Sequence, residues 1–190
     1  MEPFKKRRAG KLSGGMKQKL ALSCALIHKP SVLFLDEPTT GVDPVSRKEF
    51  WGMLQKLREQ GITIVVSTPY MDEASLCDRI ALIQNGQFLK IDTPQNIVSQ
   101  FADQLWAAKS DNMHKLLEDI RENKNIKSAF AFGDSIHVTS HLNPPKGDLN
   151  SFSIDKLTKY LIETGHKNVE INTIEPTIED CFMGLSSTQI

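Results

Sequence analysis

The chain has 190 residues, enough for one large domain or two small ones, and 39% of them are hydrophobic, which is ordinary for a globular protein. Lysine plus arginine and aspartate plus glutamate both total 23, so no net charge draws the chain to nucleic acid or to an anionic membrane. The three cysteines have no Cys-x-x-Cys spacing, which argues against a disulfide framework or a zinc site and favours a reducing cytoplasm.

The amino-terminal part starts with a basic run and continues with a predicted helix. Lys5-Lys6-Arg7-Arg8 has no interleaved aromatic residues, which is typical of a solvated flank and predicts no nucleic-acid partner. Ser13 is a predicted cap for a helix from Gly14 to about His28, which Pro30 ends. Its apolar residues recur at spacings of four, four and three and so share one face: Met16, Leu20, Cys24 and Ile27.

Two short apolar strands flank a second predicted helix. Residues 31–35 and 62–67 are mostly apolar, so we expect both strands to be buried on both faces of a parallel sheet. Between them, Asp43 and Pro44 predict the start of a helix that Gly61 ends. A strand, a helix and a strand in this order indicate a right-handed parallel crossover and therefore an α/β fold.

The rest of the chain divides into a hairpin and a second small domain. Asn85-Gly86 predicts a tight hairpin turn, and Thr93-Pro94 predicts the start of a helix. From about residue 103 the expected order is strand, helix, two strands, helix and strand, which predicts a ferredoxin-like α+β unit with a surface loop at residues 141–150. We therefore expect two domains, 1–102 and 103–190.

Three motifs that can carry chemistry follow one another in the first domain. Ser13, Gly14 and Gly15 place a hydroxyl and two small residues at a helix start, where free N–H groups favour an anion such as phosphate. An ordinary capped helix start would look the same. An apolar strand ending in Asp36-Glu37 comes next, followed by the loop from Thr39 to Pro44. The combination of all three is rare by chance.

With these motifs, residues 8–95 resemble the ATP-binding subunits of ABC transporters. The signature motif corresponds to Leu12 to Gln18, the Walker B strand to Val32 to Glu37, and the D-loop to Gly41 to Pro44. The resemblance implies a partial P-loop NTPase core with a parallel sheet, and ATP and Mg²⁺ as cofactors. It also implies a dimer with a second ATP-binding domain.

The resemblance also implies a role for each matching residue. Asp36 would hold Mg²⁺, which suits an acid at the carboxyl end of a parallel strand. Glu37 would be the catalytic base for the attacking water. Four signature residues would contact an ATP held by the other domain: Ser13, Gly14, Gly15 and Gln18. Asp43 would lie at the dimer seam, although capping its helix is a sufficient structural reason for an acid there.

The sequence departs from the family at two places. The phosphate-binding loop Gly-x-x-x-x-Gly-Lys-Ser/Thr is absent, because the one Gly-Lys pair, Gly10-Lys11, is followed by Leu12. We therefore expect a truncated or split product, or a fragment, that does not hydrolyse ATP alone. The second departure is Pro69, which follows the strand at residues 62–67 where the family usually has a histidine that contacts the γ-phosphate. Proline has no N–H to donate, which predicts weak hydrolysis.

The end of the chain points to transport. Glu175 to Phe182 is similar to the terminal accessory domain of drug- and polysaccharide-exporter ATPases, which implies a regulatory or dimer-stabilising role. The leading hypothesis is the ATP-binding subunit of an ABC exporter, peripheral on the cytoplasmic face of the membrane and paired with a permease. One alternative is a non-catalytic remnant that serves as an interaction or regulatory module. Another is an ABC ATPase of translation or DNA repair, although the tandem domains and long insertions usual there are not visible.

Overall fold

A computed structural model of the chain describes residues 6–140 and 153–187. The chain forms two compact units, Met1–Glu73 and Ala74–Ile190. The second unit therefore includes residues 74–102, which the sequence analysis assigns to the first domain. The predicted loop at residues 141–150 lies outside the described residues.

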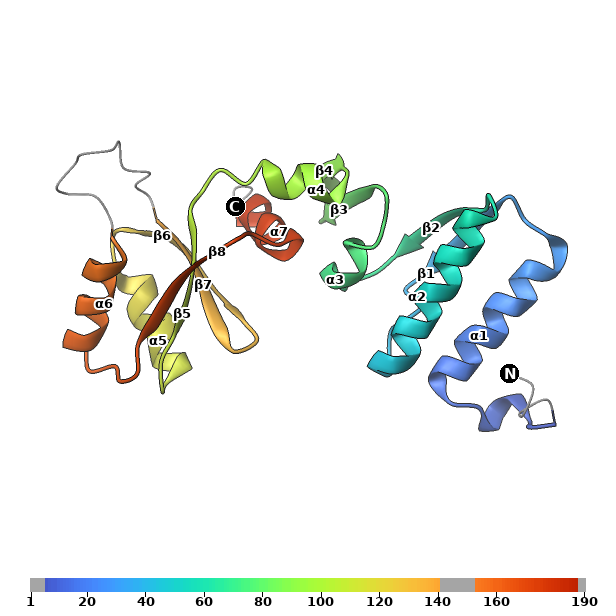
Figure 1. The fold of residues 1–190 in the computed structure, drawn as a ribbon, viewed down its shortest axis with the longest axis horizontal. Helices are drawn as coiled ribbons and strands as arrows, with labels where there is room; N and C mark the ends of the chain where they lie inside the picture. The colour runs from blue at the N-terminus through green and yellow to red at the C-terminus, as the bar shows by residue number, and fades with distance from the viewer. Residues whose placement is uncertain (1–5, 141–152, 188–190) are drawn as a thin grey trace. The chain divides into compact units, whose positions relative to one another are not determined.

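The first unit contains the predicted strand, helix and strand in a parallel arrangement. Strands β1 and β2 pair in parallel from Val32↔Thr63 to Asp36↔Ser67, which confirms the parallel pairing. Helices α1 and α2 contact each other and lie side by side (Figure 1). In chain order the elements are η2 (Ala9–Lys11), α1 (Gly14–Ala25), η3 (Leu26–His28), β1 (Val32–Asp36), α2 (Pro44–Glu59), β2 (Thr63–Ser67) and α3 (Met71–Ala74), whose last residue belongs to the second unit.

The expectation that both faces of these strands are buried is wrong. Leu33 is buried, but Phe34, on the opposite face of β1, is 74% exposed, and Val65 beside it on β2 is 48% exposed. The continuous apolar run correctly predicts strands. It does not say what covers their second face, and no described element does so.

The predicted buried face of α1 also differs from the structure. Met16 and Leu20 are half-buried, Cys24 is exposed and Ile27 is 70% exposed. The buried residues of α1 are Gly15 and Leu22 instead. Helix α2 does bury the face that faces the sheet, through Phe50, Trp51 and Leu54. The side chains of α2 therefore supply half of the buried hydrophobic residues of this unit, including both aromatic ones.

The second unit begins with the predicted hairpin. Strands β3 (Ile80–Gln84) and β4 (Gln87–Asp92) pair antiparallel. Asn85 and Gly86 both have positive φ, as a type I′ turn requires, which confirms the turn expected from this dipeptide. Thr93 then caps helix α4 (Pro94–Ser99) through a hydrogen bond to the N–H of Asn96.

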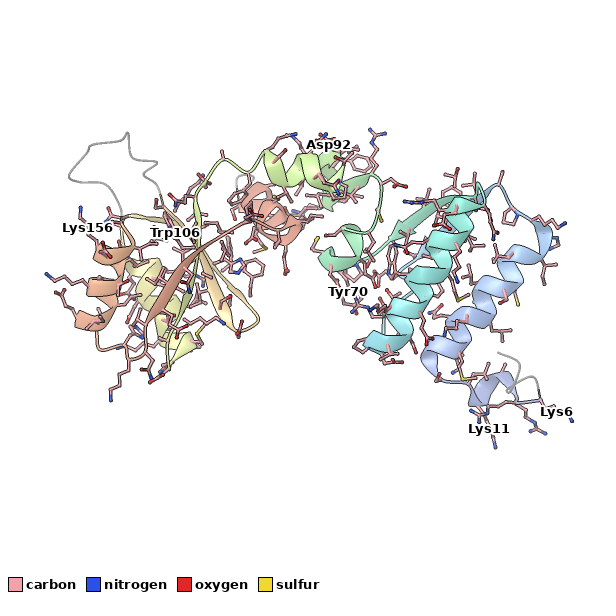
Figure 2. All side chains as sticks on the ribbon, viewed as in Figure 1. Lys6, Lys11, Tyr70, Asp92, Trp106 and Lys156 are labelled. Atoms are coloured by element: carbon pink, nitrogen blue, oxygen red, sulfur yellow. The ribbon has the colours of Figure 1, made fainter. Side chains whose placement is uncertain are left out.

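A four-stranded antiparallel sheet forms the body of the second unit. Its strand order is β6-β7-β5-β8, and helices α5 and α6 lie on one side of it while α7 lies on the other (Figure 1). The core between the sheet and α5 and α6 includes Leu116, Ile136 and Leu161, and Trp106, labelled in Figure 2, belongs to it. The elements are β5 (Leu105–Lys109), α5 (Met113–Glu122), β6 (Ile126–Phe132), β7 (Ser135–Ser140), α6 (Ile154–Glu163), β8 (Glu170–Ile174) and α7 (Ile178–Ser187).

Helix α7 was not predicted, although the sequence carries a start signal for it. The backbone N–H of Asp180 donates to the Thr177 hydroxyl, while the Asp180 carboxylate accepts from the Thr177 N–H. This reciprocal pattern is a capping box, with aspartate in the place of the usual glutamate. In the part of the chain that the structure describes, no helix combines the length and hydropathy needed to span a membrane.

Candidate functional site

The signature segment lies at the exposed start of α1. Ser13 caps the helix by accepting a hydrogen bond from the N–H of Met16, with 3.4 Å between oxygen and nitrogen. Ser13 and Gly14 are exposed, whereas Gly15 is buried and Gln18, one turn further along, is half-buried. The helix start therefore leaves Ser13 and Gly14 accessible to an incoming ligand.

The two acids lie at the carboxyl end of β1, and β2 holds them there. The hydroxyl of Ser67 on β2 donates to the Asp36 carboxylate at 2.5 Å and accepts from the N–H of Glu37 at 3.0 Å. Glu37 has φ = +42°, an uncommon value for a residue with a side chain. Its carboxylate accepts a hydrogen bond from Thr40 at 3.0 Å. Both acids are exposed and fixed in direction.

The D-loop joins the acids to α2. Two turns lead from the acids into it, because the N–H of Thr40 donates to the Glu37 carbonyl and that of Val42 to the Thr39 carbonyl. Asp43 then caps α2 by accepting from the N–H of Ser46 at 2.9 Å. This hydrogen bond holds the pKa of the Asp43 carboxyl below its usual value. The capping role read from the sequence is confirmed.

The signature segment and the D-loop touch. A β-carbon on Gly14 would lie 3.3 Å from the carbonyl oxygen of Gly41, and one on Gly15 would lie 2.6 Å from the β-carbon of Ser46. Both glycines therefore allow α1 to approach the loop and the start of α2 closely. The structure thus brings the signature segment and the D-loop into contact. The third motif, the two acids at the end of β1, is separated from the D-loop by one short loop.

A buried acid that the sequence analysis missed, Glu73, connects the elements around this site. Glu73 is 2% exposed and accepts hydrogen bonds from Thr39 at 2.9 Å and Thr68 at 2.6 Å. The guanidinium of Arg47 on α2 donates to it at 3.0 Å and lies 4.1 Å from the ring centre of Tyr70, labelled in Figure 2. The Glu73 carboxylate thereby ties the loop after β1, the loop after β2 and α2 together.

Opposing effects act on the ionisation of Glu73. Burial disfavours the charged form, but hydrogen bonds from Thr68 and Thr39 and the contact with Arg47 outweigh it and lower the pKa below the usual value for glutamate. The carboxylate therefore stays ionised inside the unit at neutral pH. No local sequence pattern reveals this cluster, because its members are separated by up to 34 residues.

Comparisons with known proteins agree with this assembly of motifs. Residues 1–40 match the protein family described as ABC transporter. The probable multidrug ABC transporter ATP-binding protein YbhF of Escherichia coli (strain K12) is 35% identical over 185 residues, which cover 96% of this chain and 30% of that protein. The chain belongs to the ABC transporter ATP-binding proteins.

Two further relatives support this membership. The daunorubicin resistance ATP-binding protein DrrA2 of Streptomyces coeruleorubidus is 30% identical over 184 residues, covering 95% of the chain and 55% of the relative. The Nod factor export ATP-binding protein I of Burkholderia orbicola is 45% identical over 92 residues, or 48% of the chain and 30% of the relative. This ABC chain thus spans between 30% and 55% of the length of these relatives.

The close approach at Gly15 gives a first prediction. Gly15→Ala is expected to lower the free energy of unfolding of this ABC chain by about 1–3 kcal/mol, because the added carbon would overlap Ser46. Gly52→Ala is the matched control, since Gly52 lies in α2 with open space around it, and it should stabilise by about 0.5–1 kcal/mol. Urea unfolding measures both. Equal unfolding midpoints for the two variants would show that the contact is absent.

Proposed function

We propose that this chain supplies the signature, Walker B and D-loop parts of the ATP-binding subunit of an ABC exporter. The observation that carries the proposal is the contact between the start of α1 and the D-loop, one short loop away from Asp36 and Glu37. That arrangement presents an exposed helix start with its capping serine, together with two acids whose side chains are oriented by hydrogen bonds. The names of the relatives, which refer to multidrug transport and Nod factor export, support an exporter.

The acids suit a magnesium nucleotide. Asp36 is exposed and has one oxygen oriented by Ser67, at the strand end where hard cations commonly bind through oxygen ligands and water. Glu37 is oriented by Thr40 and is the candidate base for water. Mg-ATP, when bound, supplies the phosphoryl group whose transfer to water drives transport. In this proposal Asp36 holds the metal and Glu37 takes the proton.

The signature residues act on a nucleotide held by another polypeptide. In this proposal the other polypeptide cradles the β and γ phosphates with a Gly-x-x-x-x-Gly-Lys-Ser/Thr loop, a pattern that residues 1–190 do not contain. Ser13 and Gly14 are accessible for such a contact, and the dipole of α1 favours an anion at this end. Gln18 and Asp43 lie beside this surface in the proposal, with Asp43 at the seam between two ATP-binding domains.

The second part of the chain is proposed to be an accessory domain. The order β5-α5-β6-β7-α6-β8 and the sheet order β6-β7-β5-β8 support a ferredoxin-like domain at residues 103–190. Its role is then regulatory or dimer-stabilising. The complete assembly includes a membrane permease, and the subunit is peripheral on the cytoplasmic face of the membrane.

Sedimentation velocity tests the proposal. The chain is mixed with an ABC ATP-binding subunit that has an intact phosphate loop, with and without Mg-ATP. We expect association only when Mg-ATP is present, because in this proposal the signature segment binds the nucleotide that the other subunit holds. Association that does not depend on nucleotide favours the rival role, a non-catalytic interaction module, which Pro69 also favours.

A further inference from the structure

The second unit contains a cavity that the proposed function does not use. Its volume is about 480 Å³, within the ~300–1,000 Å³ usual for sites that bind small molecules. It lies on the face of the antiparallel sheet opposite the core, between the sheet and helices α4 and α7. Its wall is largely apolar, with two aromatic rings, and includes Ile97, Phe101, Leu105, Phe130 and Leu185.

One histidine in the wall is held in a fixed orientation. His137 Nδ1 lies 2.7 Å from a carboxylate oxygen of Asp180, whose side chain is 3% exposed. The other oxygen of Asp180 accepts from the N–H and the hydroxyl of Thr177. A carboxylate can only accept, so Nδ1 carries the proton and Nε2 is left for another partner.

A second histidine of the same unit, His166, also pairs with an aspartate, but both of its ring nitrogens have partners within the protein. His166 uses both ring nitrogens inside the protein, with Nε2 2.8 Å from Asp119 and Nδ1 3.3 Å from the Ser110 hydroxyl, and its side chain is 1% exposed. His137 is 13% exposed and lines the cavity. Among the residues that the structure describes, its Nε2 has no hydrogen-bond partner, so this nitrogen is available to a ligand in the cavity.

The charges of the wall cancel. The wall contains two lysines, Lys90 and Lys127, and two aspartates, Asp103 and Asp180, which gives a formal total of zero. Lys127 is already paired with Asp103 at 2.6 Å. Burial raises the pKa of the Cys181 thiol to about 11, so this side chain stays neutral. The cavity is therefore suited to an uncharged ligand, with aromatic contacts along its sides and His137 Nε2 as a polar anchor.

We infer that this cavity binds a small uncharged aromatic molecule that carries a hydroxyl group, with the hydroxyl bonded to Nε2 of His137. The rings of Phe101 and Phe130 provide partners for an aromatic ligand. A hydroxyl both donates and accepts, so it fits Nε2 in either protonation state of the ring. The site is independent of the nucleotide chemistry proposed for the first unit.

Nuclear magnetic resonance of the histidine rings in the full chain tests this inference with 2-naphthol as the probe. Binding is expected to shift the ring nitrogen signals of His137 and to leave those of His166 unchanged. Naphthalene has the same rings without the hydroxyl, and it should bind about tenfold more weakly, the effect of losing one hydrogen bond. A shift of both histidines, or equal affinity for the two probes, would overturn the assignment.

A variant that fills the cavity gives a second test. A β-carbon on Gly184 would lie 3.8 Å from the ring of Phe101, an ordinary contact, so Gly184→Leu extends into the cavity without distorting α7. Unchanged His166 signals establish that the variant is folded. It should lose detectable 2-naphthol binding, whereas the Gly52→Ala control in α2 should bind as the wild type does. Binding of 2-naphthol to Gly184→Leu with wild-type affinity would refute the site.

Discussion

Glu37→Gln is expected to slow Mg-ATP turnover by about 10²–10⁴-fold once a phosphate-binding loop is supplied, because the amide cannot take a proton from the attacking water. The loop is supplied by joining an upstream segment that carries Gly-x-x-x-x-Gly-Lys-Ser/Thr to residue 1. Steady-state phosphate release then measures turnover. Nucleotide binding should be nearly unchanged, because glutamine keeps the shape of the side chain and its contact with Thr40.

Glu49→Gln is the matched control for this experiment. Glu49 lies on α2, is exposed and forms an ion pair with Lys19 on α1, so its loss changes the charge of the unit without touching the strand end. Turnover within twofold of the parent is expected for this control. A Glu37→Gln variant that also kept the parent rate would show that another group activates the water.

Arg47→Leu is expected to lower the free energy of unfolding by roughly 3–5 kcal/mol, because it leaves the buried Glu73 carboxylate without its cation. The double variant Arg47→Leu with Glu73→Leu should lose less, since it removes both charges. Urea unfolding followed by the fluorescence of Trp51, in a Trp106→Phe background, measures the change in the first unit. Lys48→Ala, at the exposed neighbouring position, should stay within about 0.5 kcal/mol of the wild type.

The contribution of the ionised Glu73 to the free energy of unfolding should decrease as the pH falls. Its folded-state pKa is lowered, chiefly because hydrogen bonds from Thr68 and Thr39 outweigh burial, so the stabilisation is complete above the unfolded-state value of about 4.3. It is lost as the pH falls below that value towards the folded-state pKa. The difference between wild type and Arg47→Leu should therefore shrink on acidification. A difference that stayed constant from neutral to acidic pH would argue against an ionised Glu73.

Local signals in the sequence were sufficient for much of the fold. Ser13, Asp43 and Thr93 each cap the helix that they were expected to cap, because a capping residue acts on N–H groups only three positions away. The turn at Asn85 and Gly86 depends in the same way on two backbone conformations. The parallel pairing of β1 and β2 follows from the order of the elements.

Local signals in the sequence could not predict which other elements and side chains each helix or strand contacts. An apolar run predicts a strand equally well whether or not a neighbour covers its second face, so the exposure of Phe34 had no signature. The cluster around Glu73 joins Thr39, Arg47 and Thr68 by side-chain contacts between distant positions. The start of α7 had a readable signal in Thr177 and Asp180, and an N-cap search would have found it.

In the candidate site, too, local motifs could be predicted from the sequence and contacts between distant residues could not. The three motifs were recognisable from residue types and order alone. The contact of Gly14 and Gly15 with Gly41 and Ser46 was not, because it depends on how closely α1 approaches α2. Gly14 and Gly15 are thus explained by the packing of α1 as well as by the proposed contact with a ligand. Only a variant that leaves the packing intact separates these two roles.

The most direct measurement is the Mg-ATP-dependent association described above, made with Ser13→Arg. Ser13 is exposed at the start of α1, so arginine there is expected to block a nucleotide held by the other subunit. Ser23→Arg, at an exposed serine later in the same helix, adds the same charge and should associate like the wild type. Loss of association in Ser13→Arg alone is the predicted result. Association of both variants with wild-type affinity would contradict the claim that the signature segment recognises nucleotide on a second polypeptide.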